Sequence, residues 1–323
     1  MYPRSNHTKQ IIMNKRSSKL ILLLLLILGV NTPVLLSQVT SQDIDDIVVR
    51  AMDNFTVAGA AVAVVKDGKI VHQKGYGIQS IATKKKVTEN TNFGIASNSK
   101  AFTTACLAIL VEEGKMAWTD KVIHYIPEFK MYNDYVTQNF NIQDLLTHRS
   151  GLGLGIGDLM FFPDGSDFTI DDILGSFQYF EPVSAFRTKF DYDNLLYLVA
   201  GEIIKRVSGL AWEQFIEQRI FNPLSMDDSY ASLTYINDQS KVASPHLNKA
   251  KKLSLTDPEQ WDPTKINGAA GGIYSNVHDL SNWMLVQLNE GKYGANLEQQ
   301  LFTEASQREM WRIHTTTEVN RNP

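Results

Sequence analysis

Hydrophobic residues recur at helical spacing near the start of the chain, and a strand-like pattern follows. Segment 42–55 has apolar positions three or four residues apart, which predicts an amphipathic helix. These positions are Ile44, Ile47, Val48, Ala51 and Phe55. Two β-rich runs within 59–77 then flank Asp67-Gly68, a pair typical of a tight hairpin turn. The pattern therefore predicts a helix followed by two antiparallel strands.

A long apolar segment comes next. Residues 101–111 are apolar on nearly every side, which predicts a helix buried all round, and Gly114 is placed to end it. Further on, residues 193–209 and 211–224 predict two more helices, stopped at Gly209 and Pro223.

Between about 125 and 255 the pattern indicates helix and loop. A glycine-rich turn and the short strand-like segment 272–275 follow, with a capped helix from about Asn276 whose first turn holds Asp279. Beyond Asn289 the sequence is polar and predicts no strand. These elements indicate a chain that mixes helices with a few strands and that is mostly helix and loop between about 125 and 255.

The predicted sheet lacks strands. A two-stranded hairpin is only marginally stable alone, so further strands are expected to complete it. Because none is evident before Pro323, we expect the domain at 38–323 to be incomplete at its C-terminus, with its last strands missing from this chain.

Composition and charge limit the classes of partner and site that the chain could have. The 323 residues carry a formal net charge of −4 and a pI near 6.0, which gives no electrostatic reason to expect nucleic acid as a partner. Cys106 is the single cysteine, so an internal disulfide and a cysteine-cluster metal site are excluded. The histidines have no metal-ligand spacing, and no cofactor is expected.

The first 37 residues resemble a targeting segment. Basic residues precede the short apolar run 20–30, the pattern of a secretory signal peptide. An uncleaved membrane anchor is the alternative interpretation. Either way we expect an exported protein, periplasmic or secreted, that contacts a membrane only if this segment is retained.

Candidate chemistry lies at the mouth of the buried helix. Ser97 and Lys100 form the only Ser-x-x-Lys match in the chain. One helical turn separates them, so the hydroxyl and the amine share a face. Burial lowers the pKa of a lysine, and a partly neutral lysine can take a serine proton. The plainer interpretation is that Asn98 or Ser99 merely caps the helix.

The context favours catalysis. Residues 93–129, together with segments 59–77, 141–152, 190–209 and 268–284, resemble the serine β-lactamase and penicillin-binding-protein superfamily, in its class C-like branch. These blocks occur in the family's order and cover about 43–288. The resemblance implies a β-lactamase/transpeptidase-like α+β fold, with an antiparallel sheet flanked by helices and an all-helical lobe at about 125–255. It also implies an acyl-enzyme mechanism at Ser97 with Lys100 as the base.

The family's second motif is Tyr-x-Asn. Matches begin at Tyr192, Tyr235 and Tyr274, but only the first directly precedes a predicted amphipathic helix of the family type. The resemblance therefore assigns Tyr192 a share in the proton transfer with Lys100. It also assigns Asn194 to holding the lysine and binding the substrate carbonyl. We interpret the other two matches as structural, and likewise His148 and Cys106.

The third motif, Lys or His followed by a small residue and glycine, is where the sequence departs from the family. The chain contains no Lys-Ser-Gly, Lys-Thr-Gly or His-x-Gly, whereas the family's strand with this motif would supply an oxyanion donor. On the Ser97 and Lys100 match and the family resemblance, we expect a serine hydrolase that acts on a β-lactam, a D-amino-acyl peptide or an ester. The alternative is a catalytically silent member that binds peptides or glycans.

Overall fold

The computed structural model describes residues 39–161, 168–256 and 268–317, so the predicted targeting segment lies outside the described residues. The chain divides into two compact units, 1–44 and 45–323, and apart from the first residues of helix α2 (Ser41–Phe55) the features below belong to the second. No helix in the described ranges is long and apolar enough to cross a membrane.

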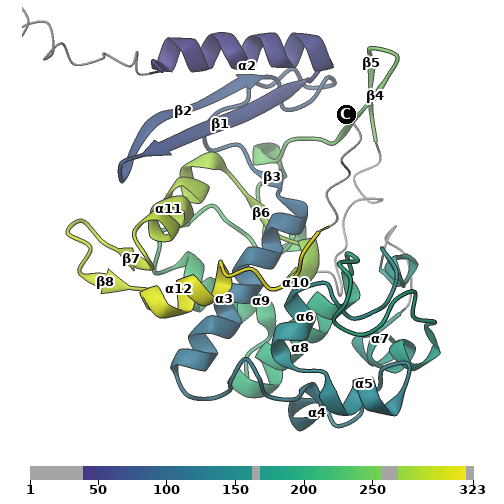
Figure 1. Ribbon diagram of the computed structural model, residues 1–323. Helices are drawn as coiled ribbons and strands as arrows, with labels where there is room; N and C mark the ends of the chain where they lie inside the picture. Colours follow the sequence, from purple (N-terminus) through teal and green to yellow (C-terminus); the bar gives the residue numbers. More distant parts are fainter. Residues whose placement is uncertain (1–38, 162–167, 257–267, 318–323) are drawn as a thin grey trace, which may run out of the picture. The chain divides into compact units, whose positions relative to one another are not determined.

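The elements along the chain are shown in Figure 1. In order they are α2 Ser41–Phe55, β1 Gly59–Lys66, β2 Lys69–Gly77, β3 Phe93–Gly94, α3 Ser99–Glu112, α4 Val122–Tyr125, α5 Asp134–Asn139, α6 Ile142–Leu146, α7 Ile170–Ser176, α8 Leu195–Ser208, α9 Trp212–Ile216, β4 His246–Lys249, β5 Lys252–Leu255, α10 Gly268–Gly271, β6 Tyr274–Ser275, α11 Val277–Leu288, β7 Lys292–Tyr293, β8 Gln299–Gln300 and α12 Glu304–Met310.

The predicted hairpin is confirmed. β1 and β2 pair antiparallel from Gly59 opposite Gly77 to Lys66 opposite Lys69. Asp67 and Gly68 form the turn with φ of 51° and 71°, left-handed values that fit the twist of a two-residue hairpin.

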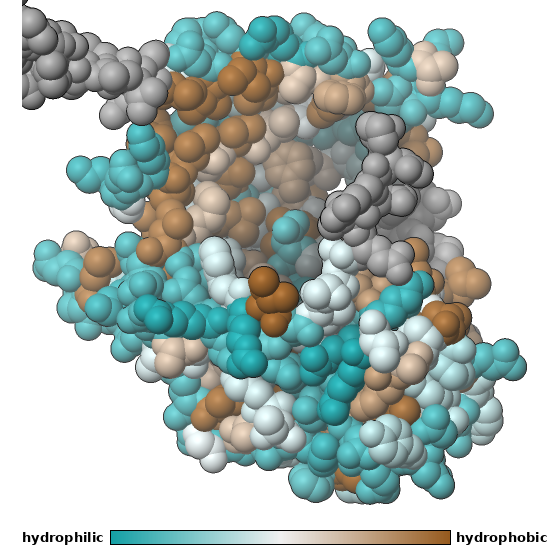
Figure 2. Space-filling model, in the orientation of Figure 1, coloured by the Kyte–Doolittle hydropathy of each residue, from teal (hydrophilic) through white to brown (hydrophobic). Residues whose placement is uncertain are grey.

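Helix α11 and the chain segment at Val87 pack against the hairpin. α11 packs on both strands (Figure 1). The backbone at Val87 runs so close to β2 that a Cβ at Gly75 would lie 2.4 Å from the carbonyl carbon of Val87. Glycine is therefore required there. Figure 2 shows hydrophobic residues gathered in the region of the hairpin. In β2, the side chains of Ile70 and Val71 are 38% and 47% exposed.

The remaining strand pairs are short. Within the described ranges every sheet has two strands, β1–β2, β3–β6, β4–β5 and β7–β8, so the α+β class is confirmed. The β7–β8 pair corrects the expectation of no strand after Asn289. It forms where Gly291 and Gly294, with φ of 86° and 88°, let the polar chain turn back on itself.

The described residues of the range 125–255 form helices and loops, and the range ends in a hairpin. β4 and β5 are joined by Ala250 and Lys251, which both adopt positive φ, 50° and 64°. Neither residue is a usual choice for such a turn, so turn chemistry gave no signal for these strands.

The main core surrounds α3. Its residues from Ala105 to Leu110 are all buried, and Cys106 is fully buried among them, which agrees with a packing role. Burial also raises the pKa of the Cys106 thiol. α8 packs on α3 and ends at Gly209 as predicted, with φ of 77°. The predicted helix 211–224 is α9 continued by a π-helical turn at Glu217–Phe221.

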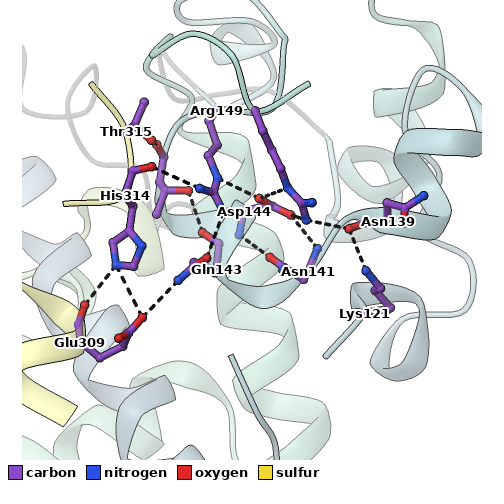
Figure 3. Close-up of polar contacts among 11 residues, drawn as sticks. Lys121, Asn139, Asn141, Gln143, Asp144, Arg149, Glu309, His314 and Thr315 are labelled. Atoms are coloured by element: carbon purple, nitrogen blue, oxygen red, sulfur yellow. Dashed lines mark hydrogen bonds and ion pairs between the residues drawn. The ribbon is translucent and has the colours of Figure 1, made fainter. Parts of the chain in front are cut away.

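A buried ion cluster fixes the segment after α6 (Figure 3). The fully buried Asp144 carboxylate accepts hydrogen bonds from Arg149 Nε at 2.9 Å and from Arg187 Nη2 at 2.6 Å. Arg149 also donates to the His314 carbonyl at 3.2 Å and to the Gln143 side chain at 3.0 Å. The cluster therefore ties α6 to the chain beyond α12.

Candidate active site

Ser97 lies at the mouth of α3, as predicted, in the 3₁₀ turn Ala96–Asn98. Ala96 before it has a φ of 47°, an unfavourable value for a residue with a Cβ and a sign of local strain. Ser97 itself is exposed. The turn is held by β3, which pairs with β6, and by Ile95 N, which donates to Ile273 O at 2.9 Å.

Ser99 has a different role from Ser97. It is fully buried, donates its hydroxyl hydrogen to Ala96 O at 2.7 Å and accepts from Ile273 N at 3.1 Å. Asn98 Nδ2 donates back to Ile95 O at 2.8 Å and makes no cap bond to α3. Of the two serines, only Ser97 is exposed for attack on a substrate.

Lys100 is the centre of the site. Its Nζ donates to Ser97 Oγ at 3.3 Å, to Asn194 Oδ1 at 2.7 Å and to Ala270 O at 2.7 Å. The structure thus brings together Ser97, Lys100 and Asn194. Burial lowers the lysine pKa to about 8, against the opposing influence of Asp158 and then Asp193.

Close packing of helices makes this lysine site possible. In α8, Gly201 faces α10 so closely that a Cβ would lie 2.8 Å from the Ala269 side chain. Glycine at this position lets α10 approach, and the carbonyl of Ala270 is then within reach of Lys100. Asn194 is positioned by the start of α8, where it is the residue before the first helical turn.

Two tyrosine rings flank the ammonium. Lys100 Nζ lies 4.9 Å from the centre of the Tyr192 ring and 5.2 Å from that of Tyr197. These are cation–π distances, and such rings stabilise the charged lysine. In the described part of the chain no hydrogen bond joins the Tyr192 hydroxyl to Lys100 or Ser97, so a shared proton stays a prediction.

His148 supports the Tyr192 segment. Its Nδ1 accepts from Asp193 N at 3.1 Å, and its ring stacks on Tyr192 with centres 4.4 Å apart. It adopts a φ of 53° and is 8% exposed. Burial, aided by the nearby Lys100 charge, lowers the His148 pKa to about 4. The ring is therefore neutral near pH 7, which fits a structural role.

Two carboxylates that sequence reasoning did not single out lie near the lysine. Asp193 is fully buried, and burial raises its pKa to about 7. Its Oδ2 has no hydrogen-bond partner among the described residues. Asp158 Oδ1 accepts from Asn194 Nδ2 at 3.0 Å, and burial raises its pKa. Asp193 could have been noticed because it is the middle residue of the Tyr-x-Asn motif.

The other candidate motifs lie in structural positions. Asn276 caps α11 by accepting from Asp279 N at 2.9 Å, while Tyr235 belongs to a 3₁₀ turn at Leu233–Tyr235. His314 contacts the Glu309 carbonyl through Nε2 at 3.1 Å. Within the described ranges no group of three His, Cys, Asp or Glu side chains could hold a metal.

Chemically, the arrangement pairs an exposed hydroxyl with a buried amine whose pKa is near 8. A nucleophile and a base within hydrogen-bond reach, with the base held by a third group, is the arrangement of an activated nucleophile. Asn194 is that third group.

Comparisons with known proteins agree with this architecture. The chain is 30% identical over 253 residues to "Unguisins hydrolase ungD'" of Aspergillus campestris, covering 75% of this chain and 46% of the relative. It is 27% identical over 288 residues to "Protein flp" of Staphylococcus aureus strain MW2, covering 88% and 55%. The chain therefore spans about half the length of these curated relatives.

A solved structure supports the fold. The octameric penicillin-binding protein homologue from Pyrococcus abyssi superposes with a TM-score of 0.69 at 24% identity, covering 82% of this chain and 58% of that one. The family profile described as Beta-lactamase matches residues 44–319. That range holds the Ser97, Lys100 and Asn194 cluster and nearly all of the described fold, so the chain belongs to the beta-lactamase family.

Proposed function

We propose that the protein is a serine hydrolase that forms an acyl-enzyme at Ser97. The observation that carries the proposal is the position of Lys100 Nζ, 3.3 Å from the exposed Ser97 hydroxyl and 2.7 Å from Asn194 Oδ1. A general base has to lie within such reach of the proton that it abstracts.

In the proposed reaction, neutral Lys100 accepts the Ser97 proton while Oγ bonds to the substrate carbonyl carbon. The tetrahedral intermediate then collapses, the bond to the leaving nitrogen or oxygen breaks, and Lys100 returns the proton to the leaving group. Water releases the acyl group by the reverse sequence. The Ser97 N–H is the first oxyanion donor in this scheme.

Tyr192 has a shared role in the proposal. Its ring lies beside the lysine, and a motion of the side chain would bring the hydroxyl to the proton in transit.

The substrate class is an amide or an ester. A relative named as an unguisins hydrolase supports hydrolysis in general terms, and family membership supports small-molecule or peptide substrates. Among the candidates of the sequence analysis, we favour a peptide or an ester over a β-lactam.

The test uses the full-length gene product with a chromogenic β-lactam, a D-Ala-D-Ala peptide and a short p-nitrophenyl ester. Hydrolysis of at least one, lost in Ser97→Ala, is the expected result. No hydrolysis of any of them by correctly folded protein would support the catalytically silent alternative, a binding protein for peptides or glycans.

We also propose that the protein is exported, on the basic and apolar pattern of residues 9–30. Cell fractionation followed by N-terminal sequencing of the mature protein tests this. Protein found in the cytoplasm with an intact N-terminus would contradict it.

A further inference from the structure

We propose that Asp158 is the binding site for a substrate's ammonium group, so that this hydrolase selects amides or esters that carry a cationic amine. The inference rests on the proposed function and adds a substrate class to it.

Asp158 is connected to the nucleophile through consecutive hydrogen bonds. Asp158 Oδ1 accepts from Asn194 Nδ2 at 3.0 Å, and Asn194 Oδ1 accepts from Lys100 Nζ at 2.7 Å. Lys100 in turn donates to Ser97. In the proposed complex, the substrate carbonyl lies at Ser97 and its ammonium group pairs with Asp158.

The Asp158 carboxylate is held in place before any ligand arrives. It follows the turn at Gly155, whose N–H donates to Tyr192 O at 2.9 Å. Gly157 in that turn packs so tightly on α8 that a Cβ would lie 2.3 Å from Leu195 Cδ1, and its φ is 72°. A preorganised group loses little conformational entropy on binding.

The local charges favour a cation. No lysine, arginine or histidine nitrogen in the described ranges lies within the 4.0 Å of an ion pair from the Asp158 carboxylate. Lys100 Nζ directs its hydrogen bonds to Ser97, Asn194 and Ala270 instead. Asp158 is only partly exposed, and a half-buried carboxylate that makes no direct ion pair gains by pairing with an incoming ammonium.

A second carboxylate reinforces this preference. Asp193 is fully buried near Lys100, and its Oδ2 has no hydrogen-bond partner among the described residues. Two carboxyl groups thus stand beside a single lysine. An anionic substrate, such as a β-lactam with its carboxylate, meets like charge at this side of the site, whereas a cationic one meets opposite charge.

The first experiment measures binding and needs no turnover. Glycinamide, 4-aminobutanamide and 6-aminohexanamide are titrated by calorimetry against their N-acetyl forms, which lack the charge. At least one amine is expected to bind the full-length protein 10-fold or more tightly than its acetylated form. Asp158→Asn, which keeps an acceptor for Asn194, should abolish that preference.

The control variant is Asp171→Asn, which removes the same charge from an exposed position at the start of α7 and should leave the preference unchanged. Equal binding of free and acetylated forms by the wild type would overturn the proposal. So would an amine preference that Asp158→Asn preserves.

The second experiment compares hydrolysis of the matching p-nitroanilides, free and N-acetylated. We expect kcat/KM to favour the free amine and Asp158→Asn to remove the difference. Hydrolysis of both forms at equal rates would refute the ammonium site and leave the hydrolase intact. Amine binding without any hydrolysis would refute the hydrolase and leave the ammonium site intact.

Discussion

Lys100 Nζ lies 3.3 Å from Ser97 Oγ, whereas the Ser99 hydroxyl is buried and bonded to the backbone. This difference predicts where an active-site probe reacts. A fluorophosphonate should label Ser97, detected by peptide mass spectrometry, and Ser97→Ala should abolish labelling. Ser99→Ala is the matched control and should still be labelled. Labelling that survives Ser97→Ala would show that the nucleophile has been assigned to the wrong residue.

Lys100 and Tyr192 should act as a unit in acylation. Loss of general-base catalysis costs at least ~100-fold, so Lys100→Ala and Tyr192→Phe should each slow acylation by at least that factor. Because both would serve one proton transfer, the double variant should be little slower than the slower single variant. Stopped-flow acylation rates of the three variants decide this. Losses that multiply would mean that the two groups work independently.

The acylation rate should also follow the lysine's protonation. Since burial lowers the Lys100 pKa to about 8, kcat/KM should rise with pH through about 8 as the amine becomes neutral. The Asp193 charge acts to raise the Lys100 pKa, so Asp193→Asn should shift the rise of kcat/KM to lower pH. Asp171→Asn should not shift it. A pH profile that is flat between 6 and 9 would contradict a lysine base.

Much of this site could be predicted from local pattern. The spacing of Ser97 and Lys100 places them one turn apart, and the structure joins them by a hydrogen bond. Asn194 is indicated by the Tyr-x-Asn motif of the family that the chain resembles, and the amphipathic helix that follows selects it among three matches; it contacts the lysine across 94 residues of sequence. The hairpin was equally readable, because Asp67 and Gly68 specify a turn type.

The rest of the site depends on tertiary contacts that leave no local trace. Asp158 begins a short 3₁₀ turn, Asp158–Met160, directly after a glycine-rich loop and 36 residues from Asn194, and nothing in the local sequence distinguishes it from other aspartates. The role of His148 is equally hard to predict from the sequence, because it depends on a contact with Asp193, 45 residues away. The strands β4 and β5 were missed because their turn residues, Ala250 and Lys251, are not typical of turns.

His148 should make folding stability sensitive to acid. Burial lowers its pKa to about 4, below the ordinary value of 6.5, so the folded state resists protonation more than the unfolded state. The contribution of neutral His148 to the free energy of unfolding is fully present above about pH 6.5. It is lost as the pH falls toward 4, by up to about 3 kcal/mol. Denaturant unfolding at pH 7 and pH 4.5 measures the loss.

His148→Asn should reduce that loss, because asparagine keeps an acceptor for Asp193 N, tolerates the positive φ and does not titrate. The control is His124→Asn, at an exposed position in α4, which should leave the difference between the two pH values as in the wild type. If His148→Asn and the wild type lose equal stability between pH 7 and 4.5, the acid sensitivity arises elsewhere.

The Asp144 cluster should be among the most sensitive points of the fold. The carboxylate is fully buried and bonds to both Arg149 and Arg187 (Figure 3), so Asp144→Asn leaves two guanidinium groups without their counterion. Removing one partner of a buried ion pair costs about 3–5 kcal/mol. We expect a loss of that size in the free energy of unfolding, measured with urea.

Glu304→Gln is the matched control, since it removes one carboxylate charge from an exposed pair with Arg308. Such pairs contribute less than about 1 kcal/mol. Because Arg149 also holds the carbonyl of His314, Asp144→Asn should in addition raise amide hydrogen exchange at 311–315, while Glu304→Gln should not. A loss below about 1 kcal/mol in Asp144→Asn would mean that the two arginines find other partners or water, and that the cluster does not hold the two segments together.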